Sequence, residues 1–358
     1  MSYCFNLPIN SVSFGQVSTV ILRSLFERGC EVFISPIGDT DFSTQQDQPE
    51  FQEWIKKSFL NFHKNYDRSN PCFKLWHLNG SSEGISKETL LMTFYELDNP
   101  TKEEVDIAKN CKTVIFTSEE SQKIFSEKGV NAKFIPLAFD KYNFYRKEKR
   151  YFDDERITFN LTGKFEKRKH HEKIIKAWTK KFGNDVKYSL QCSVYNNFLS
   201  ESQNKECFVR SVEGKRYDNV QFLGFMPKNS LFNDFLNSGD IILAMSGGEG
   251  WGLPEFHSVA IGKHAVVLNA HGYKGWANKE NATLVETKDK IDVYDGVFFN
   301  PNGKFNQGKI HDFDEEEFIN ACEKCIEKVK KEKINKKGLN LQEEFSAGKM
   351  TSKILELF

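Results

Sequence analysis

The chain has 358 residues, of which 39% are hydrophobic and 28% are charged. Its length predicts two domains, and its balance of 50 acidic and 50 basic residues argues against a protein that mainly grips a nucleic-acid backbone. We expect a cytoplasmic protein with free thiols, because the sequence shows no apolar run of membrane-helix length, no signal-peptide pattern at its N-terminus and eight scattered cysteines.

Strand-like and helix-like segments alternate in the first half. Short apolar runs predict strands at residues 31–35, 74–78, 90–95, 113–117 and 133–136. Helical periodicity predicts helices at 17–28, 102–109 and 121–128. Alternation at this spacing indicates βαβ units and a parallel sheet. Residues 138–154 are charged, aromatic and aperiodic, so we interpret them as a linker.

The alternation restarts after the linker. Strands are predicted at 157–161, 186–192, 219–223, 240–245 and 265–268, and helices at 172–180, 230–236, 254–261, 313–333, 337–345 and the tail to 358. We therefore predict an α/β protein with two Rossmann-like, doubly wound parallel-sheet domains facing a cleft. The N-terminal domain would cover residues 1–145 and the C-terminal domain 146–335, with a helical segment at 336–358 packing back on the N-terminal domain.

A glycine-rich loop follows the strand predicted at 240–245. Gly248, Gly250 and Gly252 allow backbone N–H groups to approach a ligand closely. Pro254 suits the first turn of the next helix, whose N-terminus favours a phosphate. Glu249 would repel a phosphate, so we interpret its carboxylate as an acceptor for sugar hydroxyls. The combination points to a sugar nucleotide, whereas the simpler alternative is a glycine-rich turn without a ligand.

A basic turn follows the strand predicted at 157–161. It reads GKFEKRK and runs from Gly163 to Lys169. Lys164 and Lys169 would converge on a diphosphate and neutralise it as it leaves. The alternative is a solvated basic turn, which becomes less attractive because the glycine loop follows one domain-length later in the same predicted sheet.

The order of these motifs resembles the GT-B fold retaining glycosyltransferases, in particular glycosyltransferase family 4. That family opens its second domain with G-R-x-x-x-x-K, which is similar to GKFEKRK. It also carries E-G-F-G-L-P-x-x-E-A, which is similar to EGWGLPEFHS at residues 249–258. The resemblance covers roughly residues 10–280 and is most specific at 249–267.

The resemblance implies roles for individual residues. Glu249 would hold the donor sugar, Lys164 and Lys169 would bind and stabilise the departing diphosphate, and His77 would contact the sugar from the first domain. Further donor-binding positions are Gly15, Gly163, Gly224, Phe225, Gly248, Gly250, Trp251, Gly252, Leu253 and His257. Family members transfer the sugar with retention and generally without a required metal. We therefore expect no metal site and no cofactor besides the donor, a UDP-sugar or a GDP-sugar.

The chain departs from the family pattern at two positions. Lys164 stands where the family usually has arginine, which keeps the charge but loses the planar fork. His257 stands where the family has a second glutamate that binds the ribose hydroxyls. Glu255 cannot simply replace it, because it lies about 200° away around the helix. His257 either holds a ribose hydroxyl, since a neutral imidazole accepts one bond and donates another, or is a structural residue of the first turn.

Three other features carry no chemistry in this interpretation. Cys322 and Cys325 share one face of a helical pattern, which predicts core packing rather than a metal or redox site. His170 and His171 adjoin the basic turn and predict a solvated helix start. The basic run at 328–337 predicts a solvated helix end, which would also permit peripheral contact with anionic lipid headgroups.

Three functions fit these observations. The first is a retaining glycosyltransferase acting on a hydroxyl acceptor such as a glycan or a lipid-linked acceptor. The second is a phage-type glycosyltransferase acting on modified DNA bases, which ranks lower because the N-terminal half is not basic. The third is a non-catalytic relative that binds a sugar nucleotide, which the departure at His257 keeps open. The acceptor loops at 38–50 and 79–86 carry no motif that names the acceptor, and no pattern sets an oligomeric state.

Overall fold

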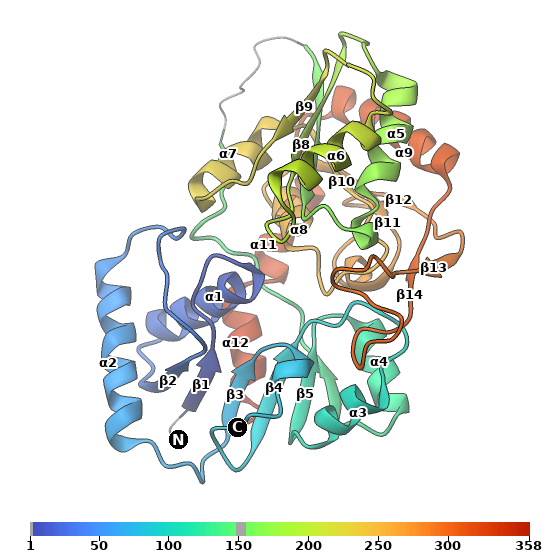
Figure 1. Cartoon of the computed structure of the whole chain (residues 1–358). Helices are drawn as coiled ribbons and strands as arrows, with labels where there is room; N and C mark the ends of the chain where they lie inside the picture. Colours follow the sequence, from blue (N-terminus) through green and yellow to red (C-terminus); the bar gives the residue numbers. More distant parts are fainter. Residues whose placement is uncertain (1–2, 148–154) are drawn as a thin grey trace. The chain divides into compact units, whose positions relative to one another are not determined.

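The structure is a computed structural model that describes residues 3–147 and 155–358. The chain forms two compact units (Figure 1). The N-terminal unit comprises Met1–Asn143, Asn302–Gln307 and Gln342–Phe358, and the C-terminal unit comprises Phe144–Pro301 and Gly308–Leu341. Each unit holds a six-stranded parallel sheet, so the prediction of two Rossmann-like domains is confirmed. Among the described residues, no helix combines the length and apolar character needed to cross a bilayer.

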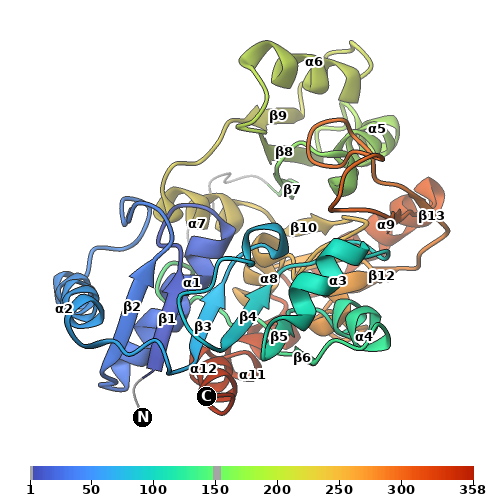
Figure 2. The same cartoon turned by 60° about the horizontal axis from the view of Figure 1, so that its bottom comes forward.

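The sheet of the N-terminal unit has the strand order β2-β1-β3-β4-β5-β6, and all of its strands run parallel (Figure 2). Most of these strands are buried apolar runs, as expected for a parallel sheet covered on both faces. Their bounds are β1 Tyr3–Leu7, β2 Val32–Pro36, β3 Cys72–Leu75, β4 Thr89–Thr93, β5 Thr113–Phe116 and β6 Ala132–Phe134.

The helices of the N-terminal unit connect these strands. They are α1 Ser13–Glu27, α2 Pro49–Asn65, η1 Leu78–Gly80, α3 Lys102–Lys109 and α4 Glu119–Glu127. The start of α3 is fixed by a capping box. The Glu104 N–H donates to the Thr101 hydroxyl over 3.2 Å, and the Thr101 N–H donates to the Glu104 carboxylate over 2.8 Å. Such reciprocal bonds satisfy two donors that a helix start otherwise leaves open.

The end of the chain belongs to the N-terminal unit, where α12 (Ala347–Leu355) packs against α1. Arg28 at the end of α1 donates to the Ser352 hydroxyl over 2.9 Å. The last residue, Phe358, places its ring edge-on to Tyr3 at a centroid distance of 5.1 Å. Strand β1 and the chain terminus therefore stabilise each other within one unit.

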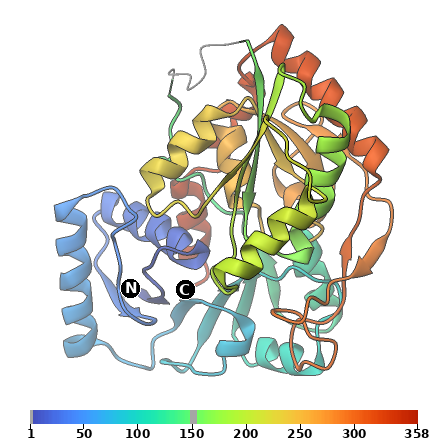
Figure 3. The same ribbon diagram turned by 45° about the horizontal axis from the view of Figure 1, so that its top comes forward.

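The sheet of the C-terminal unit has the order β12-β11-β10-β7-β8-β9, again parallel throughout. Figure 3 shows this sheet with helices on both faces. Helices α5 and α9 contact each other on one face, and α7 and α8 contact each other on the other. The strand bounds are β7 Ile157–Gly163, β8 Tyr188–Val194, β9 Val220–Leu223, β10 Ile241–Ala244, β11 His264–Leu268 and β12 Thr283–Val285.

Helices and short turns complete the C-terminal unit. They are η2 Lys167–Lys169, α5 His171–Phe182, α6 Glu201–Ser211, α7 Asn229–Ser238, α8 Leu253–Ala260, η3 His271–Gly275, α9 Glu315–Lys331 and α10 Lys336–Leu339, and α11 (Leu341–Glu344) lies at the crossing back to the N-terminal unit. Cys322 and Cys325 of α9 are fully buried in the hydrophobic core, in agreement with a packing role. An antiparallel hairpin of β13 (Lys290–Asp292) and β14 (Lys309–His311) precedes α9.

Several elements lie outside the sequence-based prediction. Strand β1, helix α2, helix α6 and the β13–β14 hairpin were not predicted. Helix α2 illustrates the reason, because only Phe51, Ile55 and Ser58 are buried along its length and its apolar stripe is therefore thin. The described part of the predicted linker, residues 138–147, includes buried side chains such as Phe139 and Asp140. The remaining linker positions, 148–154, lie outside the described residues.

Candidate active site in the C-terminal unit

The glycine loop spans residues 246–252, between β10 and α8. Gly247 packs so closely that a Cβ atom there would lie 2.2 Å from the carbonyl oxygen of His311. Gly252 precedes α8 with a φ of +77°, and a Cβ atom there would lie 2.2 Å from Cε1 of Tyr273. The fold itself therefore requires glycine at both positions. The close packing on either side of Glu249 fixes the position of its backbone in the loop.

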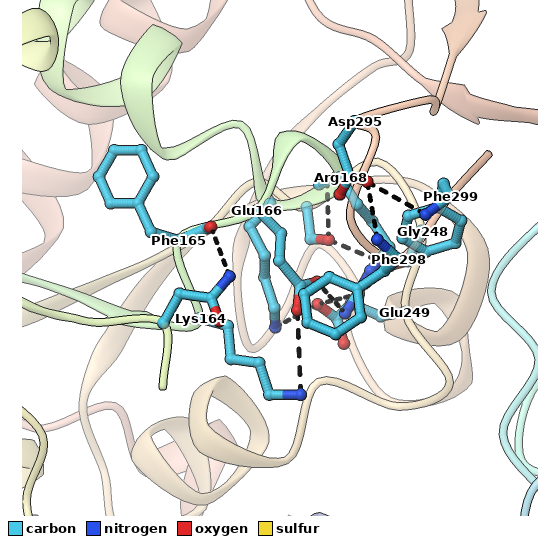
Figure 4. Close-up of polar contacts among 12 residues, drawn as sticks. Lys164, Phe165, Glu166, Arg168, Gly248, Glu249, Asp295, Phe298 and Phe299 are labelled. Carbon is cyan, nitrogen blue, oxygen red and sulfur yellow. Dashed lines mark hydrogen bonds and ion pairs between the residues drawn. The ribbon is translucent and has the colours of Figure 1, made fainter. Parts of the chain in front are cut away.

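Five charged side chains of this unit form a buried group that we call the charge cluster, and each is less than a tenth exposed: Glu166, Arg168, Lys169, Glu249 and Glu255. Arg168 Nη1 lies 3.0 Å from Glu249 Oε1, and Arg168 Nη2 lies 3.1 Å from Glu166 Oε2. Lys169 Nζ lies 2.5 Å from the same Glu249 oxygen. Figure 4 shows Glu166, Arg168 and Glu249 with these contacts. The cluster forms because β7 and β10 are neighbouring strands, so the turn after one meets the loop after the other.

The charged groups of this cluster shift one another's pKa values. Burial alone would raise the pKa of Glu249, but the Lys169 ammonium and the Arg168 guanidinium outweigh it and lower that pKa to about 2. Burial would likewise lower the pKa of Lys169, but Glu249 and Glu255 outweigh it and raise the pKa. Glu249 is therefore an ionised carboxylate at neutral pH, held in place by two buried cations.

Glu255 behaves differently from Glu249. It lies in the first turn of α8 with 2% of its surface exposed, and its Oε2 atom has no hydrogen-bond partner. Burial is the main cause that raises the pKa of Glu255 to about 7, with Glu249 adding to the rise and Lys169 opposing it. The cluster thus contains one acid that is firmly ionised and one that titrates near neutral pH.

The basic turn places its two predicted lysines in different surroundings. Lys169 is buried and packs over Gly163, where an added Cβ atom would lie 3.3 Å from Lys169 Cε and where φ is +118°. Lys164 has a half-exposed side chain, and its Nζ lies 3.9 Å from Glu166 Oε1. Lys169 therefore belongs to the charge cluster, whereas Lys164 lies at its rim and is open to solvent.

Two phenylalanine rings flank the Lys164 ammonium. Its Nζ lies 5.1 Å from the ring centroid of Phe198 and 5.4 Å from that of Phe298. Phe298 lies in a turn fixed by Asp295, whose Oδ1 accepts the N–H groups of residues 297–299 over 2.9 to 3.0 Å (Figure 4). The rings limit where the flexible Lys164 side chain can go, because they attract its charge over their faces.

His170 and His171 are not a solvated helix start, and that prediction is wrong. His170 is 6% exposed and His171 is 2% exposed. The His170 Nε2 atom lies 2.8 Å from the His311 carbonyl oxygen, and the His171 Nε2 atom lies 3.1 Å from the Thr162 carbonyl oxygen. Burial lowers the pKa of His171 to about 3, with the Lys169 charge adding to the shift. Both imidazoles therefore hold the basic turn against the sheet as neutral rings.

His257 lies on α8 and is almost fully buried. Its ring stacks on Phe144 at a centroid distance of 4.4 Å and an interplanar angle of 21°. Burial lowers the pKa of His257 to about 3, so the imidazole is neutral at physiological pH. The ring thus has a packing role in the C-terminal unit, and a contact to ribose stays a proposal.

The other predicted donor-binding residues of this unit lie in the same loops. The side chain of Trp251 is buried and packs against Phe256 at a centroid distance of 5.5 Å. Leu253 is partly buried at the start of α8, and Gly248 and Gly250 are buried in the glycine loop. Gly224 and Phe225 follow β9, and Phe225 is 53% exposed.

Two predicted donor-binding residues, Gly15 and His77, belong to the N-terminal unit. Gly15 lies in the first turn of α1, where an added Cβ atom would lie 2.2 Å from the Asn10 carbonyl oxygen. His77 precedes η1, and its ring lies 4.4 Å from the ring of Phe14. Phe14 is the chain neighbour of Gly15, so the contact between the Phe14 and His77 rings brings the start of α1 next to the start of η1 within this unit.

The sequence interpretation gave no role to Arg168, Glu166 or Glu255. Arg168 stood inside the quoted basic turn, and no feature of that segment signalled its buried pairing with Glu166 and Glu249. Glu255 was considered only as a replacement for His257. Its position three residues into the helix places it near the helix start instead, where it faces Lys169 and Glu249. Within the described ranges, 3–147 and 155–358, no group of three His, Cys, Asp or Glu side chains is arranged to hold a metal ion.

Comparison with known proteins identifies the fold. No protein-family model matches the chain, and no curated protein matches it. Among solved structures, sucrose-phosphate synthase from Thermosynechococcus elongatus has a TM-score of 0.66 at 14% identity, covering 100% of this chain and 94% of its own. HepE from Anabaena in complex with UDP and glucose has a TM-score of 0.68 at 15% identity, covering 99% and 98%.

A third similar structure, trehalose 6-phosphate synthase from Burkholderia multivorans, has a TM-score of 0.64 at 10% identity and covers 100% of this chain and 98% of its own. These similarities cover at least 99% of this chain and at least 94% of each solved structure. At these levels of identity they establish a shared fold. The chain therefore has the two-domain GT-B fold of these three proteins.

Proposed function

We propose that this protein is a retaining glycosyltransferase that moves a sugar from a nucleotide-diphosphate sugar to a hydroxyl acceptor. The observation that carries the proposal is the charge cluster at the carboxyl ends of β7 and β10. Ligands bind at such strand ends in parallel sheets, and the fold is shared with HepE, which was determined in complex with UDP-glucose. A buried carboxylate held by two cations beside a glycine loop suits a donor that carries both hydroxyls and phosphates.

In this proposal each charged group has one task. Glu249 accepts hydrogen bonds from donor sugar hydroxyls, since its ionised state is secured by Lys169 and Arg168. Lys164 and Lys169 neutralise the diphosphate. Lys164 is exposed enough to meet phosphate oxygens directly, and Lys169 acts from its buried position next to Glu249. Fixed charges of this kind stabilise a developing anion without reorganising at the moment of reaction.

The chemical step follows from these roles. The bond between the anomeric carbon and the diphosphate oxygen breaks, and the diphosphate leaves with the electron pair. The acceptor oxygen bonds to the same face of the anomeric carbon, and its proton passes to the departing phosphate or to solvent. The lysines supply the positive charge, so the proposed step needs no metal. The resemblance to glycosyltransferase family 4 also implies donor contacts for His77 and Gly15, and His257 would bond one ribose hydroxyl.

The proposal is tested by donor turnover. UDP-glucose is the first donor to try, because HepE was determined with UDP and glucose, and other UDP-sugars and GDP-sugars follow. The wild-type protein should release nucleoside diphosphate, faster when a suitable acceptor is present. Glu249→Gln keeps the shape of the side chain and should lower the rate by about 10²–10³-fold.

Glu323→Gln is the matched control, because Glu323 is half exposed and pairs with Lys181 far from the cluster in sequence. It should retain the wild-type rate. Binding of nucleotide without any release of diphosphate would favour the non-catalytic alternative. An unchanged rate in Glu249→Gln would remove Glu249 from the proposed site.

A further inference from the structure

The N-terminus of α8 is already partly occupied by the chain itself. A helix start normally offers several N–H groups to an anion. Here Pro254 contributes no N–H, whereas the bond from the Phe256 N–H to the Gly252 carbonyl oxygen, over 2.9 Å, is the ordinary first bond of the helix. The Glu255 carboxyl folds back onto its own N–H and toward Gly252, where an added Cβ atom would lie 3.3 Å from Glu255 Oε2. A carboxyl group therefore lies where a phosphate is expected.

The buried acidic and basic groups near the start of α8 are unequal in number. The charge cluster holds three carboxyl groups against two cations. Both cations approach Glu249 Oε1, and Arg168 also serves Glu166. Glu255 is left with an unpartnered oxygen although only 2% of its surface is exposed. An ionised carboxylate in that position would repel the phosphates of a donor across a buried, weakly screened distance.

The groups that face Glu255 come from three elements. Lys169 and Arg168 of η2 favour its ionised form, and Glu249 of the glycine loop opposes it. Tyr273 of η3 adds a phenol that stays neutral, because burial raises its pKa well above the ordinary value. One carboxylate, two cations and a neutral phenol thus surround Glu255. An anion that arrives there adds negative charge and favours the protonated form of Glu255.

We propose that the donor diphosphate binds to the form of the protein in which Glu255 is protonated. The carboxylate takes up one proton from solvent as the phosphates arrive, and the neutral carboxylic acid remains in place as a hydrogen-bond donor at the start of α8. Glu255 is thus a positioning residue for the diphosphate. The inference rests on the proposed function, because it assumes a nucleotide-diphosphate donor in the C-terminal unit.

The proposal predicts a pH dependence of donor binding. Burial raises the pKa of Glu255 to about 7, so protonation becomes costly above that pH. The dissociation constant of the wild-type protein should rise about tenfold between pH 6 and pH 8. Glu255→Gln, which is permanently neutral, should bind with the same affinity at both pH values. UDP-glucose and GDP-mannose are the probes, since a diphosphate diester does not itself titrate in this range.

Calorimetry gives an independent readout that needs no variant. Titrations at pH 7.5 in two buffers with different ionisation enthalpies report the number of protons taken up per nucleotide bound. The wild-type protein should take up most of one proton, and Glu255→Gln should take up none. Glu315→Gln is the control, because it makes the same change in the exposed first turn of α9 and should leave both measurements at wild-type values.

The outcomes separate this inference from the proposed function. If donor binds with no proton uptake and with the same pH profile in wild type and Glu255→Gln, the inference is overturned and the proposed function stands. If neither donor binds at any pH, both fall. A purely structural role for Glu255 would change the melting temperature of the variant but would not flatten the pH profile.

Discussion

In the N-terminal unit, Arg23 is buried with its guanidinium 4.9 Å from the ring centroid of Tyr142 and 5.3 Å from that of Phe51. Its Nη2 donates to the Gln46 carbonyl oxygen over 3.0 Å. Among the carboxylates, Asp140 has the strongest charge interaction with Arg23. Asp140 is itself bonded by Asn143 over 2.7 Å. One cation and one anion are thus matched in number, although Arg23 Nε and Nη1 have no hydrogen-bond partner.

The charge cluster of the C-terminal unit buries charge to a similar depth but is not balanced. It holds three carboxyl groups against two cations, and both cations approach Glu249. The cluster also lies at the ends of neighbouring parallel strands, where ligands bind. Buried charge by itself therefore indicates little about function. Charge that is unequal in number, at a strand end, indicates a site that a ligand completes.

The largest expected effect is that of Glu249→Ala on stability. Removing this carboxylate leaves Arg168 and Lys169 buried without compensation, which costs about 3–5 kcal/mol when one partner of a buried pair is deleted. Urea denaturation should show a loss of that size in the free energy of unfolding. A loss below about 1 kcal/mol would show that the cluster is less buried in solution than the structure indicates.

Arg23→Met should break the balanced site and leave the other unaffected. The variant keeps an apolar stem between the rings but leaves Asp140 without its cation, so we expect a loss of about 2–3 kcal/mol in the free energy of unfolding. Donor affinity, measured by calorimetry below the unfolding transition, should stay at the wild-type value. A tenfold loss of donor affinity would contradict the contrast between the two buried charge sites.

The stability of Glu255→Gln should depend on pH in a defined direction. Because the folded protein raises the pKa of Glu255 to about 7, this group stabilises the fold most below the ordinary pKa and loses that contribution as the pH rises through 7. The free energy of unfolding of the variant should therefore rise relative to that of wild type by on the order of 2 kcal/mol between pH 5 and pH 8. Parallel denaturation curves at both pH values would show it, and a constant difference would contradict the assignment.

His257→Phe should have the smallest effect. Phenylalanine preserves the stack on Phe144, so stability at pH 7 should change by less than about 1.5 kcal/mol. Burial lowers the pKa of His257 to about 3, so wild type loses stability as the pH falls below 6.5. The variant lacks this group, so its stability relative to wild type should rise over the same range of pH. Donor affinity should fall about fivefold if one neutral hydrogen bond to ribose is lost. Unchanged affinity would leave His257 with packing alone.

The sequence was sufficient to predict the fold class because parallel strands are buried apolar runs that stand out from amphipathic helices. It also placed Lys169 and Glu249 in two loops of one sheet. It did not reveal Glu255 or Arg168 as members of the cluster, because their importance depends on which neighbours burial brings to them. His170 and His171 were misjudged for the same reason, since a charged flanking sequence does not show that one ring contacts a hairpin that arrives later in the chain and the other contacts the end of β7.

The central claim is that the charge cluster binds the donor diphosphate. The most direct test compares donor binding to wild type, Lys169→Met and Lys181→Met by calorimetry with UDP-glucose and GDP-mannose. Lys181 pairs with Glu323 over 2.6 Å on the surface and is the matched control. The account predicts that one donor binds wild type and Lys181→Met equally and binds Lys169→Met at least tenfold more weakly, with all three proteins folded. Equal binding to all three would contradict it.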